Sequence, residues 1–237
     1  MIRSALVAVW LAVLALPGAS GAGPFTAFET DLLDAYAAYR TALFQSNMGN
    51  AAATSQALDL FAGRWGAISA TWGMTPPPQY ADDPAFGQTL KEVGDTITRA
   101  TKDVKADNLP AVHATLEKVR DEIGALHERN GLIGFSDRMN AYHTEMERVI
   151  GLDLRNPDAQ QLQSLSDGAA VLAYLAAEIA ANPAPGSADP AYQGLVEGLT
   201  TSVATLQAAV RTGDAAACRA AVAKLKPAYS KLFLRFG

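Results

Sequence analysis

The residues of this chain that could bind a metal or a cofactor lie close together in the sequence. All three histidines and two of the five methionines fall between residues 113 and 146. On a helix, residues three or four apart share a face, so His143 lies one turn from Met139 and one turn from Met146. This spacing predicts one helix face that carries both imidazole and thioether donors.

A helical hairpin that turns near Ile133 would bring one more histidine to the level of Met139 and complete a set of four: His127, Met139, His143 and Met146. Thioether and imidazole together suit copper, above all Cu(I), because both are soft or borderline donors. The two methionines are also in phase with the apolar residues around them, which is typical of a helix core. Two interpretations therefore stay open: a copper site, and a packed core without a metal.

The segment Arg138–His143, with the sequence Arg-Met-Asn-Ala-Tyr-His, resembles the Arg-Asn-Ala-Tyr-His segment of cytochrome b562, an exported four-helix bundle. The resemblance covers this segment and the general architecture, and here one extra residue follows the arginine. It implies non-covalent binding of haem b, with His143 as one axial ligand and a methionine as the other. The candidates for that methionine are Met48, Met74 and Met139.

Motifs for other chemistries are absent from the sequence. There is no Cys-x-x-Cys-His for covalent haem attachment, no Gly-rich phosphate loop, no G-x-S-x-G and no H-E-x-x-H. The net charge of -5 and the lack of any Lys/Arg run argue against nucleic-acid binding. The single cysteine, Cys218, lies in an Ala-rich stretch and is expected to be buried. We therefore expect a metal-binding or haem-binding protein, or a cofactor-free structural or interaction module, rather than an enzyme.

The N-terminus predicts export from the cell interior. Residues 1–22 contain one basic residue, Arg3, then an apolar run from Ala5 to Leu16 and a small-residue site that ends at Ala22. The apolar run is shorter than the roughly 20 residues of a membrane span. We expect a signal peptide that is cleaved after Ala22, and a mature periplasmic or secreted protein without a membrane span.

The remainder of the chain indicates an internal duplication. Asp83-Pro84-Ala85-Phe86 recurs as Asp189-Pro190-Ala191-Tyr192, at an offset of 106 residues. The same offset aligns apolar and capping residues along the stretches that follow each copy. We therefore predict two homologous halves, residues 23–131 and residues 132–237.

Each half has the pattern of four helices. Apolar residues recur at helical spacing, and proline-rich breaks at 75–78 and 183–187 separate the second predicted helix from the third. Asp83 and Asp189, each followed by proline, are predicted N-caps of the third helix. No run alternates in the manner of a strand. The predicted fold is all-α, a tandem duplication of an antiparallel four-helix unit with about eight helices.

Overall fold

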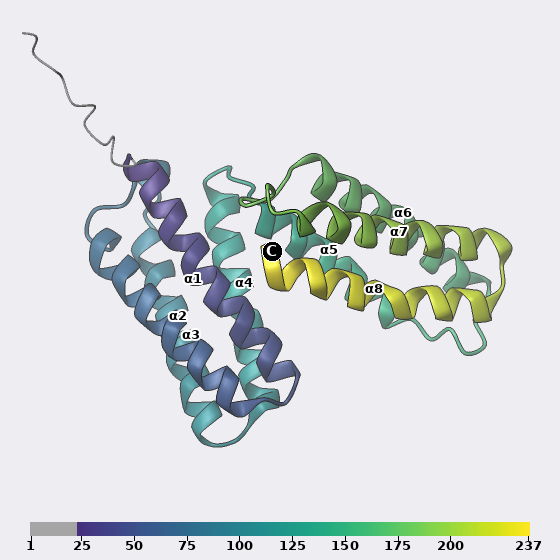
Figure 1. Ribbon diagram of the computed structural model, residues 1–237, viewed down its shortest axis with the longest axis horizontal. Helices are drawn as coiled ribbons and strands as arrows, with labels where there is room; N and C mark the ends of the chain where they lie inside the picture. Colours follow the sequence, from purple (N-terminus) through teal and green to yellow (C-terminus); the bar gives the residue numbers. More distant parts are fainter. Residues whose placement is uncertain (1–22) are drawn as a thin grey trace, which may run out of the picture.

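The computed structural model describes residues 23–237, and within this range the chain is all-α. Eight α-helices and one short 3-10 helix follow one another, and no strand occurs between residues 23 and 237 (Figure 1). The predicted fold class is therefore confirmed. The predicted signal peptide, residues 1–22, lies outside the described residues.

The helices pack as two groups of four. Within each group, each helix packs against the next one along the chain, α1 also packs against α4, and α5 also packs against α8. The N-terminal group consists of α1 (Pro24–Asn47), α2 (Ala51–Trp72), α3 (Phe86–Lys105) and α4 (Leu109–Arg129), with η1 (Pro78–Tyr80) before α3. The C-terminal group consists of α5 (Phe135–Ile150), α6 (Ala159–Ala181), α7 (Ala191–Thr212) and α8 (Ala215–Phe236).

The two groups have cores of different composition. The N-terminal core is rich in aromatic side chains, and the indole Nε1 of Trp65 donates a hydrogen bond to the Leu90 carbonyl at 2.9 Å. The C-terminal core has fewer buried aromatic side chains, among them the stacked Tyr142 and Tyr229, and Cys218 is buried in it, as the sequence predicted. The wholly buried aromatic residues of the N-terminal group are Phe28, Tyr39, Phe61, Tyr80 and Phe86.

Capping side chains set the start of the last helix in each group. Asn108 accepts a hydrogen bond from the backbone N–H of Ala111, and Asp214 accepts one from Ala216. Each side chain satisfies a donor that has no partner inside its own helix, which favours helix formation at that residue.

The third helix of each group begins later than predicted. Asp83 accepts the backbone N–H of Ala85 at 2.9 Å, and Asp189 accepts that of Ala191 at the same distance. These aspartates close a tight turn just before the helix, as aspartates do when they hydrogen-bond two residues ahead. The prediction that they are N-caps was therefore wrong by two residues for α3 and by one for α7, whose N-caps are Ala85 and Pro190.

The two groups meet where α1 approaches α8, near the C-terminal end of α8 (Figure 1). Arg40 on α1 donates hydrogen bonds to the backbone carbonyls of Arg235 and Gly237. The side-chain amide of Asn140 on α5 donates to the Tyr36 hydroxyl at 3.4 Å. These polar contacts hold α1 against both α5 and α8, and they place a set of charged side chains between the groups.

One helix, α6, is long and apolar enough by length and composition alone to cross a membrane. In the structure it packs between α5 and α7, and Leu165, Leu172 and Ile179 are buried in the core. A third of its most apolar window is buried, so several apolar side chains also face outward.

Candidate functional site

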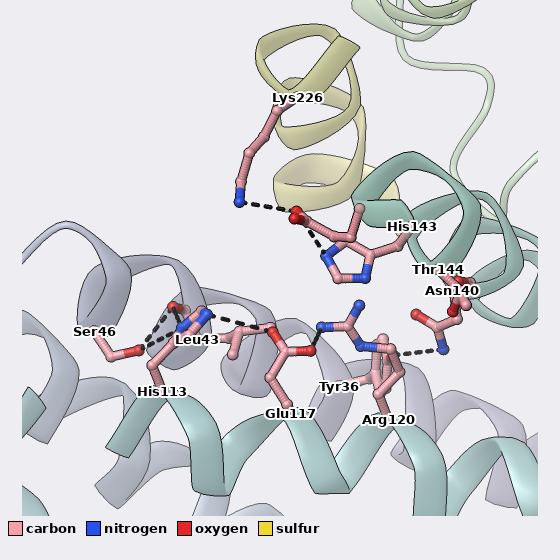
Figure 2. Close-up of polar contacts among 11 residues, drawn as sticks. Tyr36, Leu43, Ser46, His113, Glu117, Arg120, Asn140, His143, Thr144 and Lys226 are labelled. Atoms are coloured by element: carbon pink, nitrogen blue, oxygen red, sulfur yellow. Dashed lines mark hydrogen bonds and ion pairs between the residues drawn. The ribbon is translucent and has the colours of Figure 1, made fainter. Parts of the chain in front are cut away.

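A cleft lined by both charged and apolar side chains lies between the two helix groups, and we call it the inter-group cleft (Figure 2). It contains a cavity of about 60 Å³, which has room for a few water molecules. Helices from both groups contribute side chains to it, so its shape depends on how the groups are placed. Its charged, imidazole and hydroxyl side chains include His113, Glu117 and Arg120 from α4, His143 from α5, and Lys226 and Tyr229 from α8.

Arg120 is the most buried charged residue of the cleft, with 6% of its surface exposed. Its guanidinium donates to Glu117 and lies 5.9 Å from the centre of the Phe233 ring. Burial lowers the pKa of Arg120, but the neighbouring Tyr39, Tyr229 and Glu117 outweigh this effect and raise it above its usual value. The side chain therefore stays charged, while its Nε has no hydrogen-bond partner.

His143 faces this arginine from α5. Its ring packs against Tyr229, with ring centres 5.3 Å apart, and its Nε2 lies 3.6 Å from Oε1 of Glu147. The same glutamate oxygen accepts a hydrogen bond from Lys226 at 2.9 Å. Burial lowers the pKa of His143 to about 4, and the positive charge of Arg120 adds to this effect. His143 is therefore neutral at neutral pH, which is the form of imidazole that binds metals.

His113 is held in one orientation by α1. Its Nδ1 lies 3.3 Å from the Leu43 carbonyl and 3.3 Å from the Ser46 hydroxyl. A carbonyl oxygen only accepts, so the hydrogen bond to Leu43 places the ring hydrogen on Nδ1. In the neutral ring Nε2 then carries a lone pair, and it lies 3.4 Å from Oε1 of Glu117. Two acceptors face each other there, an arrangement that a cation bound between them would stabilise.

The two histidines share a pattern that the sequence reasoning missed. Each is followed by a glutamate four residues later, Glu117 after His113 and Glu147 after His143, and this spacing puts each pair on one helix face. In the cleft the two pairs come from different helix groups, and a basic residue neutralises each glutamate: Arg120 for Glu117 and Lys226 for Glu147. The repeated His-x-x-x-Glu spacing is the signal that could have found them.

Of the four metal ligands predicted from the sequence, only His143 lines the inter-group cleft. Met139 and Met146 are wholly buried in the C-terminal core. His127 lines a separate cavity, where its Nδ1 lies 2.8 Å from Oδ2 of Asp137. The cleft therefore does not gather the predicted set, because the methionines pack in the apolar stripe and His127 is engaged at the turn between the groups.

The cleft offers pairs of donors rather than a complete metal centre. Between residues 23 and 237, no three His, Cys, Asp or Glu side chains lie close enough together to hold one metal ion. Each His–Glu pair would need a further ligand, from a bound molecule or from closer approach of the other pair.

Comparisons of this chain with family models, with curated proteins and with solved structures found no match. The similarity to the cytochrome b562 segment therefore stays an expectation drawn from residues 138–143.

Proposed function

We propose that this protein is an exported binding protein, not an enzyme, that takes up a transition metal in the inter-group cleft, with copper preferred and His143 as the central ligand. The observation that carries the proposal is the neutral, largely buried imidazole of His143 in a cavity shared with a second histidine, His113. Imidazole and carboxylate donors bind Cu(II) more tightly than the other divalent first-row metals, including zinc.

The second feature in favour of a metal is the hydrogen bond that orients the imidazole ring of His113. Histidines that bind metals are usually oriented by a hydrogen bond from their other ring nitrogen, often to a backbone carbonyl. His113 has this arrangement, with Nδ1 against the Leu43 carbonyl and Nε2 turned toward Glu117. A divalent cation would replace Arg120 as the partner of Glu117, or Lys226 as the partner of Glu147.

The sequence favours Met139 and Met146 as the ligands that bind the metal together with His143, whereas the cleft geometry favours His113. One experiment distinguishes these two ligand sets. The mature chain is titrated with Cu(I), Cu(II) and Zn(II), each as the metal alone against a competing chelator. We expect His143→Ala and His113→Ala each to weaken copper binding at least tenfold. We expect the double variant Met139→Leu, Met146→Leu to bind copper like the wild type.

Each outcome of this titration has a defined meaning. If the methionine variant loses binding and His113→Ala does not, the ligand set is the one predicted from the sequence. If the wild type binds none of the three ions, or His143→Ala binds them unchanged, the proposal is wrong. His127→Gln separates the two ligand sets further: we expect it to bind copper like the wild type because this histidine lies in another cavity, whereas the set predicted from the sequence requires it to weaken binding.

The haem alternative has weaker support from the geometry. The cavity beside His143, at about 60 Å³, is far smaller than a porphyrin, so the two groups would have to separate to admit one. Of the candidate axial methionines, Met48 and Met74 are exposed, at 62% and 95%, and Met139 is wholly buried. A Soret band on addition of haem, lost in His143→Ala, would establish this alternative instead.

A further inference from the structure

A second cavity lies between α4, α5 and α6, and we call it the α4–α6 groove. It has a volume of about 720 Å³, within the range of sites that bind small organic molecules. Neither His113 nor His143 lines it, and Arg120 is the one residue that lines both this groove and the inter-group cleft.

The charged side chains of the groove are mostly acidic. Asp121 and Glu128 on α4 and Glu178 on α6 line it, and none of them forms an ion pair within residues 23–237. Of the two arginines that line it, Arg120 is paired with Glu117, and Arg138 donates to the backbone carbonyls of Ile133 and Gly134. The groove therefore has three carboxylates without an ion-pair partner and one arginine, Arg138, whose guanidinium is held by backbone carbonyls, so its charge is negative on balance.

The inner part of the groove also has acceptors without donors. Oδ1 of Asp137 and Oδ1 of Asn140 are buried, and neither has a hydrogen-bond partner. Gly124 on α4 faces Asp137 and has no side chain to fill the groove. A Cβ added at Gly124 would lie 4.0 Å from Oδ1 of Asp137. Both buried oxygens are covered by protein atoms, so they do not contact a ligand directly, but their negative charge and partial charge lie beneath the groove wall and favour a cationic ligand.

Large apolar side chains border the same groove. Ile133 and Tyr174 are exposed at 69% and 64%, and both line it. The face of an exposed tyrosine ring attracts cations, and the same ring also packs against hydrocarbon chains. A matching ligand therefore combines positive charge with an apolar chain.

We propose that the α4–α6 groove binds a small organic cation: an amine whose ammonium groups contact the carboxylates and whose hydrocarbon chain lies along Tyr174 and Ile133. A single metal ion does not fit the same data, because the described residues hold no cluster of three ligands close enough for one.

The test uses two probes of equal length, 1,8-diaminooctane and 1,8-octanediol, which differ only in the charged groups. Isothermal titration of the mature protein is expected to show binding of the diamine, weakened by added salt, and none of the diol. We expect Glu128→Gln and Glu178→Gln each to weaken binding about fivefold, the effect of a lost ion pair of ~1 kcal/mol. Gly124→Leu is expected to block the groove and abolish binding without any change of charge.

The control is Asp59→Asn, which removes an exposed carboxylate on α2, far along the chain from the groove. We expect it to bind the diamine like the wild type. The proposal is wrong if the diamine binds no better than the diol. It is also wrong if Asp59→Asn weakens binding as much as the groove variants do, or if Gly124→Leu, folded by circular dichroism, binds the diamine unchanged.

Discussion

His127 donates a hydrogen bond to Asp137 across the turn that joins the two helix groups, with Nδ1 and Oδ2 2.8 Å apart. The same carboxylate oxygen accepts the backbone N–H of Gly134 at 2.6 Å, at the start of α5. Both side chains are largely buried, at 8% and 16% exposed. One carboxylate thus connects the end of α4 with the beginning of α5 and fixes the direction in which the second group leaves the first.

The first prediction concerns this carboxylate. Asp137→Ala removes the N-terminal hydrogen bond of α5 and leaves a buried imidazole N–H without a partner, so we expect a loss of about 1–3 kcal/mol in the free energy of unfolding. Urea denaturation measures it. Asp121→Ala is the control, because this residue is exposed and its side chain forms no hydrogen bond within residues 23–237. Equal losses in the two variants would show that the His127 contact contributes nothing.

The second prediction is a pH dependence that arises from Asp83. Burial raises the pKa of its carboxyl, but the hydrogen bonds from Asn130 and Ala85 and the pairing with Arg129 together outweigh this effect and hold the pKa below its usual value. A group with a lowered pKa in the folded state stabilises the fold above its unfolded pKa, and the contribution is lost as the pH falls through the folded value. The stability that Asp83 provides should therefore be complete above about pH 4 and disappear below it.

Urea denaturation of the wild type and of Asp83→Asn over this pH range tests the second prediction. We expect the difference between them to be constant from neutral pH to about pH 5 and to shrink below about pH 4. The neighbouring Asp82→Asn, at an exposed position, is the control. A difference that grows on acidification would contradict the assignment.

The third prediction concerns the close packing of α5 against α6 at Gly168. An added Cβ there would lie 2.5 Å from Cγ2 of Val149 and 2.6 Å from a guanidinium nitrogen of Arg148. Gly168→Ala should therefore lower the free energy of unfolding by about 1–3 kcal/mol, since the core has to shift to admit the methyl group. Gly63→Ala on α2, where nothing lies within 4 Å, should instead stabilise the protein by about 0.5–1 kcal/mol. Thermal unfolding of both variants measures the two effects: a lower melting temperature for Gly168→Ala and a higher one for Gly63→Ala are expected, and an increase for Gly168→Ala would contradict the steric argument.

The secondary structure was predictable from the sequence because it depends on local patterns. Helical spacing of apolar residues and the proline-rich breaks at 75–78 and 183–187 predicted the number and order of helices. The placement of the two groups was not predictable. It depends on contacts such as that between Asn140 and Tyr36, which are far apart in the sequence and belong to no recurring pattern.

The candidate site was predictable only in part, for a related reason. His143 could be found because histidine is rare in this chain, but Arg120 follows the apolar Val119 and looks like an ordinary surface residue of a helix. It is buried where the two groups meet, between tyrosines of α1 and the Phe233 ring of α8. Met139 and Met146 could be interpreted either way, and the structure places them in the core.

The last prediction uses the offset of 106 residues that suggested the duplication. Arg129 pairs with Asp83 at 3.1 Å, and the residues one offset later, Arg235 and Asp189, pair at 2.6 Å. Corresponding contacts of this kind are what a duplication predicts, although the duplication itself stays a prediction.

The two pairs differ in burial, and this sets their expected energies. The Asp83 side chain is 4% exposed, whereas that of Asp189 is 33% exposed. Removal of the arginine leaves a buried carboxylate in the first case and a hydrated one in the second. We therefore expect Arg129→Ala to cost about 1.5–3 kcal/mol and Arg235→Ala about 0.2–1 kcal/mol. Chemical denaturation of the two variants measures both costs, and a larger loss for Arg235→Ala would show that the shorter contact, rather than the more buried one, determines the energy.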